Sequence, residues 1–346
     1  MSTFDLTQPL YFKPVMMERV WGANRLDRLF GKPIPPGQTI GESWELVDRP
    51  EAQSTVTAGP CEGRTLRELM EHDPQGVLGA LLSAARPDRF PLLVKYVDAG
   101  TPLSVQVHPD DHGAIPFKDR GKSECWVVVH LEPGALITRG LKPGTTRAQY
   151  EKAVREDRVE DVLHSFVPKL GDLIALPPGM VHAIGSGVVV AEIQQNSDLT
   201  FRIYDYKRVG LDGKPRKLHI QEALASIRFG DPGNEFAGDM RADTVRGYSG
   251  ETVGGVTHER LLEGVYFALS RYRLEPGATL TLPRDLGAPR IVMAIEGQGS
   301  FNGRELKAGD TTLLCAAAED ASIAASRSGT TVLVSRPTLK ACERPS

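Results

Sequence analysis

The chain of 346 residues lacks a strong excess of charge of either sign. Its 41 lysines and arginines nearly balance its 44 aspartates and glutamates, and the formal net charge is −3. So small a charge does not predict binding to nucleic acid or to an anionic membrane surface. No apolar run approaches the roughly 18 residues of a membrane helix, and the opening MSTFDLTQPLYF lacks the basic and apolar regions of a signal peptide. We therefore expect a soluble, cytoplasmic protein with no nucleic-acid or membrane partner.

Cysteine is also scarce. Cys61, Cys125, Cys315 and Cys342 lie far apart in the sequence and form no C-x-x-C motif. This spacing predicts neither a zinc ribbon nor a disulfide framework. We expect free thiols in a reducing cytosol.

Glycine and proline are plentiful, with 35 and 25 residues, and they separate short β-branched segments. Many short strands between turn residues predict a mainly β fold, either a sandwich or a barrel. Helical patterns occur in three places only: 65–71, which begins with a capping-box pair of Thr65 and Glu68, 146–164 and 219–227. The predicted strands are 90–96, 103–108, 124–130, 135–138, 187–195, 266–274, 291–296 and 331–335.

A faint internal repeat relates residues 171–184 to residues 309–323. Each stretch begins with Gly-Asp after a strand-like segment and continues into apolar residues. Two copies of one β module suit a chain of this length, since about 150 residues per domain predicts two domains. The second copy has Ala-Ala-Ala-Glu-Asp-Ala where the first has Pro-Pro-Gly-Met-Val-His, so it lacks a counterpart of His182. The polar, glycine-rich residues 229–254 are the predicted linker.

The segment LSVQVHPDD, residues 103–111, carries polar side chains at alternate positions. In a strand, Ser104, Gln106 and His108 share one face and the two valines share the other. Such a strand suits a small barrel with a polar, functional interior. The alternative is an edge strand whose polar face meets solvent.

Two further segments offer metal-binding side chains. In GKSECWVVV, Lys122 and Glu124 share one strand face and Cys125 lies on the other, whereas His182 follows a rigid Pro-Pro-Gly turn. Taken singly, Glu124 is typical of surface charge and His182 of packing. Together with the amide and imidazole of 103–108 they form an N/O ligand set for one divalent ion. Two histidines and a glutamate also bind catalytic zinc. The same ligand set does not exclude manganese, iron or cobalt.

The segment AEIQQNSDLTFRIYDYKR, residues 191–208, is dense in polar residues. Arg202 lies between Phe201 and Ile203 and should face the opposite, polar side. Its planar guanidinium suits an anionic or oxygen-rich substrate, and the alternative is a surface salt bridge. The basic loop that follows is either solvated or attracts a phosphate group, and it contains Lys207, Arg208, Lys214, Arg216 and Lys217.

These motifs give the chain a resemblance to type I mannose-6-phosphate isomerases, of the shorter bacterial branch, within the cupin superfamily. VQVHPDD, GKSECW and PPGMVHAIGSGVVVAEIQQNSDLTFRIYDYKR carry most of the resemblance. It implies a mainly β fold of two tandem cupin (jelly-roll) β-barrel modules with a few inserted helices. The catalytic module would span 1–228, with an N-terminal extension and a helical insert at about 146–164, the linker 229–254, and a metal-free module 255–346.

The resemblance also implies roles for individual residues. It implies a single Zn²⁺ per chain, with other divalent metals open, held by Gln106, His108, Glu124 and His182. It implies a catalytic role for Arg202. By the same resemblance Lys122 is a further catalytic candidate, and Lys95 and Ser104 are candidates for substrate binding.

The implied activity is the interconversion of mannose 6-phosphate and fructose 6-phosphate through an enediol(ate). The base is left open between Lys122 with a depressed pKa and a histidine near the metal. Two alternatives belong to other classes: a sugar-binding regulatory cupin without turnover, and an iron cupin oxygenase with the same two-histidine, one-carboxylate ligand set. The expected partner is a small phosphosugar, and the expected oligomeric state is a monomer or a weak dimer.

Overall fold

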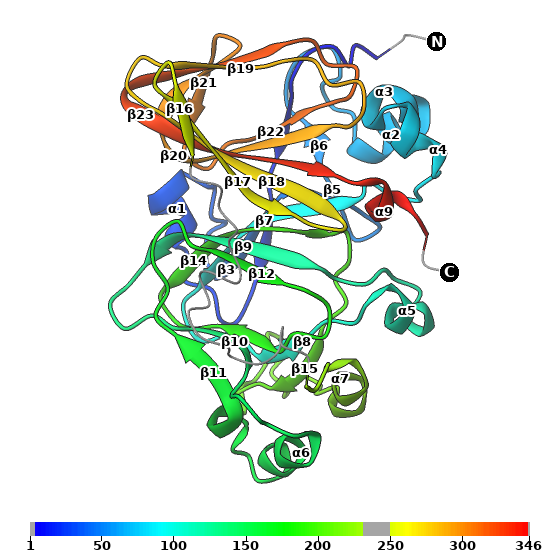
Figure 1. Ribbon diagram of the computed structural model, residues 1–346, viewed down its shortest axis with the longest axis vertical. Helices are drawn as coiled ribbons and strands as arrows, with labels where there is room; N and C mark the ends of the chain where they lie inside the picture. Colours follow the sequence, from blue (N-terminus) through cyan, green and yellow to red (C-terminus); the bar gives the residue numbers. More distant parts are fainter. Residues whose placement is uncertain (1–3, 231–249, 345–346) are drawn as a thin grey trace.

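The computed structural model describes residues 4–230 and 250–344, and it has a mainly β architecture, as predicted (Figure 1). Most strands belong to three antiparallel sheets. All four cysteines are buried and free, which confirms the expectation of free thiols. The predicted linker 229–254 falls mostly on residues 231–249, outside the described residues. Among the described helices none is long and apolar enough to cross a membrane.

Two of the sheets face each other and form the first barrel. Side chains from both sheets pack between them, among them Trp126 and Val190 from one sheet and Ile137 and Ile184 from the other. The six-stranded sheet has the order β12 (Leu173–Leu176), β9 (Glu124–Leu131), β14 (Val188–Gln195), β7 (Leu92–Ala99), β3 (Ile40–Leu46) and β2 (Val15–Glu18). The five-stranded sheet has the order β11 (Leu163–Phe166), β10 (Ile137–Leu141), β13 (His182–Ile184), β8 (Val105–Val107) and β15 (Phe201–Tyr204).

The third sheet curves around a second apolar interior that includes Phe301 and Val334. Its long strands β20 and β23 shift register where they bend, which lets one sheet enclose this interior. Its main order is β16 (Glu251–Val253), β17 (Val256–Glu263), β18 (Phe267–Leu274), β23 (Ala321–Pro337), β20 (Arg290–Phe301), β22 (Thr311–Leu314), β1 (Leu10–Lys13) and β6 (Thr55–Val56). In addition β19 (Thr279–Leu282) pairs with β23, β21 (Arg304–Lys307) pairs with β20, and β4 (Asp48–Arg49) pairs with β5 (Ala52–Gln53).

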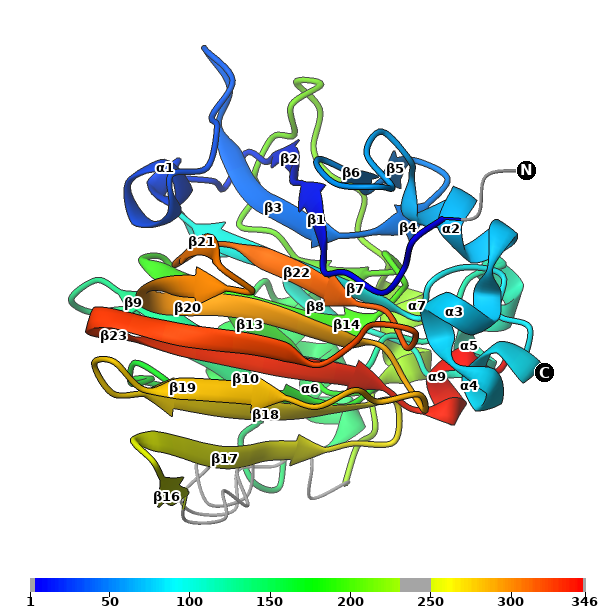
Figure 2. The same ribbon diagram turned by 90° about the horizontal axis from the view of Figure 1, so that it is seen from above.

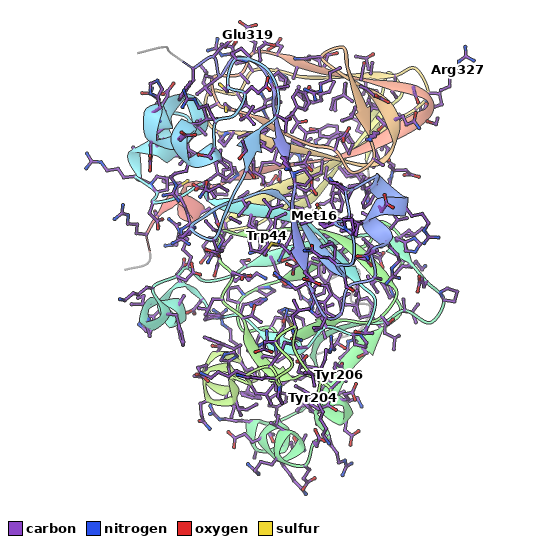
Figure 3. The ribbon with its side chains drawn as sticks, turned by 180° about the vertical axis from the view of Figure 1, so that it is seen from behind. Met16, Trp44, Tyr204, Tyr206, Glu319 and Arg327 are labelled. Atoms are coloured by element: carbon purple, nitrogen blue, oxygen red, sulfur yellow. The ribbon has the colours of Figure 1, made fainter. Side chains whose placement is uncertain are left out.

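The two barrels lie against each other and share one apolar core. Alternate residues of β9 separate the two interiors: Trp126 faces the first barrel, whereas Cys125 and Val127 pack in a cluster with Met293 of the second. Met16, near the middle of Figure 3, also packs against this shared cluster. The chain start contributes as well, since β1 pairs with β22 and is seen beside it in Figure 2.

The helices agree only in part with the sequence prediction. α2 (Leu66–His72) has the predicted capping box and α7 (Ile220–Ser226) matches the third prediction. The predicted helix over 146–164 is too long, because α6 (Arg147–Arg155) ends before Asp157, whose φ of 59° is left-handed. The expectation of only three helices is also wrong, since pieces this short leave no periodic signal. The other pieces are α1 (Arg25–Phe30), α3 (Pro74–Leu78), α4 (Ala80–Ala84), α5 (Asp111–Ala114), η1 (Ile115–Phe117), η2 (Val159–Val162) and α9 (Leu339–Cys342).

The internal repeat is confirmed by matching hydrogen bonds. The Gly171 amide donates to the Val128 carbonyl at 2.8 Å, and the Gly309 amide donates to the Ala294 carbonyl at 2.7 Å. The aspartate after each glycine accepts a hydrogen bond from the backbone amide three residues earlier, at 2.8 Å and 2.9 Å. These turns therefore occupy the same place in the two barrels. The division into modules 1–228 and 255–346 stays a prediction.

Candidate metal centre and its cavity

Three strands of the first barrel bring two histidines and a glutamate together. His108 follows β8, Glu124 begins β9 and His182 begins β13. Their ligand atoms all lie within 4.8 Å of one another, and all three residues are buried. The Nε2 atom of His182 is 3.4 Å from Glu124 Oε1, and that of His108 is 3.6 Å from Glu124 Oε2.

Backbone carbonyls orient both imidazoles. The Nδ1 atom of His108 is 2.9 Å from the Leu199 carbonyl, and the Nδ1 atom of His182 is 2.8 Å from the Met180 carbonyl. A carbonyl can only accept, so each Nδ1 carries the proton and each Nε2 keeps its lone pair toward Glu124. Burial lowers the pKa of both histidines, that of His108 well below its usual value. Both are therefore neutral, the form that binds metal.

Glu124 provides the test of whether a cation fits here. Both carboxylate oxygens are buried without a hydrogen-bond partner of good geometry among the described residues, although Lys122 Nζ lies 2.6 Å from Oε2. Burial alone would raise the pKa of Glu124, but the charge of Lys122 lowers it below its usual value. A buried anion with unused lone pairs, facing two imidazole Nε2 atoms, is a ligand set that a divalent cation would complete.

Gln106 lies at the edge of this cluster. It pairs across the sheet with His182 of β13 and with Arg202 of β15. Its Nε2 atom is 3.3 Å from His182 Nε2, and its Oε1 atom accepts from Ser104 Oγ at 3.2 Å. Rotating the amide by 180° would turn Oε1 toward the cluster while Ser104 Oγ could accept from Nε2. Gln106 can therefore offer an oxygen to a bound ion without losing its hydrogen bond.

Two buried lysines lie beside the cluster. Lys122 Nζ is 3.3 Å from Glu192 Oε1 in addition to its contact with Glu124. Lys95 Nζ is 3.4 Å from Glu192 and 3.7 Å from Glu42. Burial would lower the pKa of Lys122, but the two glutamates raise it above its usual value. A depressed pKa for Lys122, one of the two possibilities left open for the base, is therefore contradicted in this arrangement, which holds the side chain as an ammonium ion.

A cavity of about 550 Å³ opens beside these groups. Arg202 projects into it, whereas its neighbours Phe201 and Ile203 are buried in the apolar core, as strand alternation predicted. Arg202 Nη1 donates to the Lys217 carbonyl at 3.1 Å, and its buried Nε has no hydrogen-bond partner among the described residues. The predicted site residues that line the cavity are Lys95, Ser104, Gln106, Lys122 and Arg202.

Known proteins match both the sequence and this architecture. Residues 10–123 match the family model of the type I phosphomannose isomerase catalytic domain. Mannose-6-phosphate isomerase ManA of Bacillus subtilis is 35% identical over 314 residues, which cover 89% of this chain and 93% of that protein. The chain belongs to the type I phosphomannose isomerase family.

Other members of the family agree with this assignment. A mannose-6-phosphate isomerase of Streptococcus mutans is 35% identical over 66% of this chain and 71% of its own length. The crystal structure of mannose 6-phosphate isomerase from Bacillus subtilis superimposes with a TM-score of 0.83 at 31% identity, covering 94% of this chain and 99% of that one. A structure from Archaeoglobus fulgidus has a TM-score of 0.74 at 21% identity over 97% of this chain and all of that one, which shows that the two chains share a fold.

Several charged residues of the cavity were not predicted from the sequence. Glu42 and Glu192 line it from the middle of buried strands, and Asp198 and Arg19 line it from loops. The sequence pattern could have indicated Glu42 and Glu192, because a glutamate inside a largely apolar strand, such as VVVAEIQQ, is expected to have a buried partner. Of the basic loop, Arg216 reaches the cavity.

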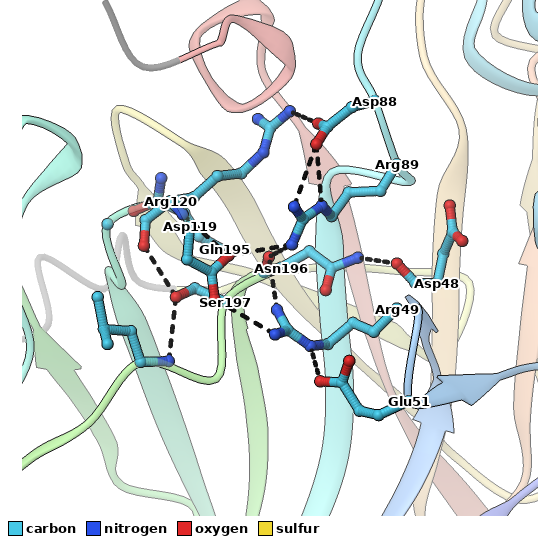
Figure 4. A network of polar contacts seen from close by, with 12 residues as sticks. Asp48, Arg49, Glu51, Asp88, Arg89, Asp119, Arg120, Gln195, Asn196 and Ser197 are labelled. Atoms are coloured by element: carbon cyan, nitrogen blue, oxygen red, sulfur yellow. Dashed lines mark hydrogen bonds and ion pairs between the residues drawn. The ribbon is translucent and has the colours of Figure 1, made fainter. Parts of the chain in front are cut away.

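Part of the QQNSD run has a structural role in this chain. Figure 4 shows Gln195, Asn196 and Ser197 joined to neighbouring loops. Asn196 Nδ2 donates to the carbonyls of Asp48 and Phe90, and Ser197 Oγ donates to the Arg120 carbonyl at 2.8 Å. The first residues of the run thus hold the loops at one end of the barrel, while the residues after them line the cavity.

Proposed function

We propose that this chain interconverts mannose 6-phosphate and fructose 6-phosphate through an enediol(ate) in the cavity of its first barrel. The observation that carries the proposal is the buried cluster of His108, Glu124 and His182 beside a cavity that also presents Arg202 and Lys122. The relative that is 35% identical over most of both chains bears the name mannose-6-phosphate isomerase.

We propose Gln106, His108, Glu124 and His182 as the ligands of one divalent ion per chain. Zinc suits two neutral imidazoles and a carboxylate, and manganese, iron and cobalt suit the same N/O set. A bound ion of this kind supplies Lewis-acid stabilisation of negative charge on an oxygen of the substrate.

The cationic side chains would position the sugar and stabilise charge on it. Arg202 lines the cavity and its Nε has no acceptor among the described residues, so we propose that its guanidinium donates to an oxygen of the substrate. Lys122, held as an ammonium ion, can donate to a neighbouring sugar oxygen. Ser104 and Lys95 line the same cavity and are proposed to bind sugar hydroxyl groups. When a base takes the C–H proton next to the carbonyl, before a proton returns to the neighbouring carbon, these fixed donors oppose the negative charge that develops on the enediol(ate).

The setting of the enzyme follows from its proposed substrate. We place the chain in the cytoplasm, where phosphorylated sugars are made and used, and its four buried free thiols suit a reducing compartment. A monomer or a weak dimer stays the prediction for the oligomeric state.

The deciding experiment follows turnover in the absence of oxygen. Metal-loaded protein is mixed with fructose 6-phosphate under anaerobic conditions, and mannose 6-phosphate is measured by enzymatic coupling, with metal content determined on the same sample. We expect turnover without oxygen. Binding of the sugar phosphate without turnover would favour a regulatory cupin, and a requirement for oxygen would favour an iron oxygenase.

A panel of hexose 6-phosphates then tests the substrate assignment. We expect the highest kcat/KM with mannose 6-phosphate and fructose 6-phosphate. A higher kcat/KM for another aldose–ketose pair would contradict the substrate while keeping the reaction class. Glu124→Gln is the matched control, because it removes the carboxylate of the proposed ion site at nearly constant volume.

A further inference from the structure

The second barrel contains a counterpart of the metal centre. The matching turns at Gly171 and Gly309 bond to Val128 and Ala294, which makes these two carbonyl-bearing residues equivalent. Four residues earlier on each strand stand Glu124 and Arg290. Both pair across the sheet with the last residue of the next strand, Leu176 and Leu314 respectively. The second barrel therefore has an arginine in the position of the glutamate of the metal cluster.

Arg290 lines a cavity of about 440 Å³ in that barrel. The volume lies in the range of small-molecule sites. One wall is a parallel pair of rings, His258 and Tyr272, with centroids 4.4 Å apart and an interplanar angle of 4°. Four arginines and two carboxylates line the cavity, which leaves an excess of positive charge: Arg260, Arg284, Arg290 and Arg336, against Glu263 and Asp285.

The guanidinium of Arg290 is buried and only partly used. Its residue exposure is 6%, and Nη1 donates to the Pro283 carbonyl. Nε and Nη2 are buried without a hydrogen-bond partner, and no carboxylate lies within 4.0 Å among the described residues. A buried charge without a partner is costly. This arginine therefore has two buried donors that no acceptor among the described residues satisfies.

Two other arginines of this chain hold a carboxylate with the same two atoms. Arg271 uses Nε and Nη2 to grip the carboxylate of Glu259, at 2.6 and 3.1 Å. Arg216 grips Asp205 with the same two atoms. Nε and Nη2 together form a planar fork that matches two oxygens of a carboxylate or a phosphate. At Arg290 the fork is formed but no oxyanion of the described protein occupies it.

We propose that the cavity of the second barrel binds a small molecule that carries a phosphate group, with the Arg290 fork on two phosphate oxygens. The excess of arginines favours a dianion over a monoanion, and the volume leaves room for a small organic group against the rings of His258 and Tyr272. The metal-free barrel is thus a second ligand site, independent of isomerase turnover.

Calorimetric titration of the full, metal-loaded chain tests this site with inorganic phosphate, glycerol 3-phosphate and acetate as probes. We expect Arg290→Gln to remove one equivalent of phosphate binding, or to weaken it at least about tenfold, while kcat and KM for fructose 6-phosphate stay within about twofold. Arg336→Gln, which changes another arginine of the same cavity, should also weaken binding of this one equivalent of phosphate. It replaces Arg290→Gln in the test if that variant does not fold. Comparing the two phosphates shows whether the organic group adds affinity.

Arg327→Gln is the matched control, because it removes the same charge from an exposed site at the outer edge of the second barrel, where Figure 3 labels it. It should leave phosphate binding unchanged. The proposal is overturned if both cavity variants bind as much phosphate as the wild type, if Arg327→Gln weakens binding equally, or if acetate binds at this site as tightly as phosphate. Density for phosphate against Arg290 Nε and Nη2 in soaked crystals would support it directly.

Discussion

At Glu124, burial and a neighbouring ammonium group act in opposite directions on the pKa of one carboxyl group. Burial is the largest effect and would raise it, but Lys122 at 2.6 Å, together with the other polar groups around the carboxylate, lowers it below its usual value. The result is a charged pair inside the barrel. Removing Lys122 would leave the Glu124 charge buried without its counter-ion, which is strongly destabilising, whereas removing Glu124 would leave Lys122 paired with Glu192 alone, at 3.3 Å, and would change the charge balance of the cluster. A ligand that is neutral in this structure is therefore the better position at which to test metal binding.

His182→Ala is that test. His182 is neutral, buried and fixed by the Met180 carbonyl, so its loss removes a proposed ligand without leaving a new unpaired charge. We expect loss of the bound metal and of isomerase activity together, with a circular dichroism spectrum like that of the wild type. Atomic emission spectroscopy on the wild type should show one equivalent of metal per chain. Two tightly bound equivalents would refute the prediction that the second barrel holds none.

Arg202→Lys separates a catalytic role from a structural one. The substitution keeps the positive charge and removes the fork geometry. A lost transition-state contact of this kind costs roughly 2.7–4 kcal/mol, or about two to three powers of ten in kcat. A loss confined to KM would instead indicate a role in binding the ground state. Steady-state kinetics with metal content held constant decides between them, and a kcat within about threefold of the wild type, the scale of an exposed ion pair, would refute the catalytic role.

Among the elements, β9 shows how one strand serves two environments. Glu124 and Trp126 face the first barrel, and Cys125 and Val127 face the core shared with the second. The alternation of side chains accounts for this separation. It also explains why no sulfur ligand reaches the cluster, because Cys125 points to the opposite face from Glu124. A shift of this strand by one residue would place Glu124 between the two barrels and turn the Cys125 thiol toward the first barrel.

The loops at the end of these strands are joined by a network of arginines and aspartates (Figure 4). Asp88 accepts from Arg120 at 2.5 Å and from Arg89 at 3.1 Å, and Arg120 in turn donates to the Ala341 carbonyl near the chain end. Burial raises the pKa of Asp88, but the hydrogen bond and charge of Arg120 outweigh it and lower the pKa to about 2. The network therefore depends on Asp88 being ionised.

The sign of the pH effect follows from that lowered pKa. Since the unfolded value is 3.8, the contribution of Asp88 to stability is fully present above about pH 5 and is lost as the pH falls through 4 toward 2. We expect Asp88→Asn to be less stable than the wild type at pH 7 and the difference to shrink below pH 4, in urea unfolding measured across this range. The exposed Glu62→Gln is the control. A difference that stayed constant from pH 7 to 3 would contradict the role of the Asp88 charge.

At the scale of the whole molecule, the shared core makes the two barrels depend on each other. Met293 of the second barrel and Val127 of the first belong to one apolar cluster, and the Tyr96 hydroxyl donates to the Ala294 carbonyl across the contact at 3.1 Å. Neither barrel could separate without exposing this cluster to water. The molecule should therefore unfold as one unit.

Met293→Ala tests that cooperativity. All three tryptophans of the chain, Trp21, Trp44 and Trp126, lie in the first barrel or its N-terminal part, so tryptophan fluorescence reports unfolding there. Removing the buried Met293 side chain should cost about 2–5 kcal/mol and lower the urea midpoint equally by fluorescence and by circular dichroism. A lower midpoint by circular dichroism alone would show that the barrels unfold separately.

The sequence by itself predicted those features that depend on local alternation and turn chemistry. The shared face of Ser104, Gln106 and His108, the opposite directions of Glu124 and Cys125, and the place of His182 after its turn all follow from a period of two residues and a rigid Pro-Pro-Gly. The capping box at Thr65 is equally local. These patterns need no knowledge of what lies across the barrel, and so they could be read from neighbouring residues alone.

Only the tertiary structure decided the electrostatic environment of those residues and the position of Arg290 in the second barrel. Lys122 contacts Glu192 from 70 positions away, and this contact, together with Glu124, raises the pKa of Lys122, whereas the sequence left a depressed pKa open as one of two possibilities. Arg290 stands where the first barrel has Glu124 only because two strands pair in the same register in both modules. Strand pairing joins residues distant in the chain, and buried charges act on each other through space. Neither effect has a period along the sequence.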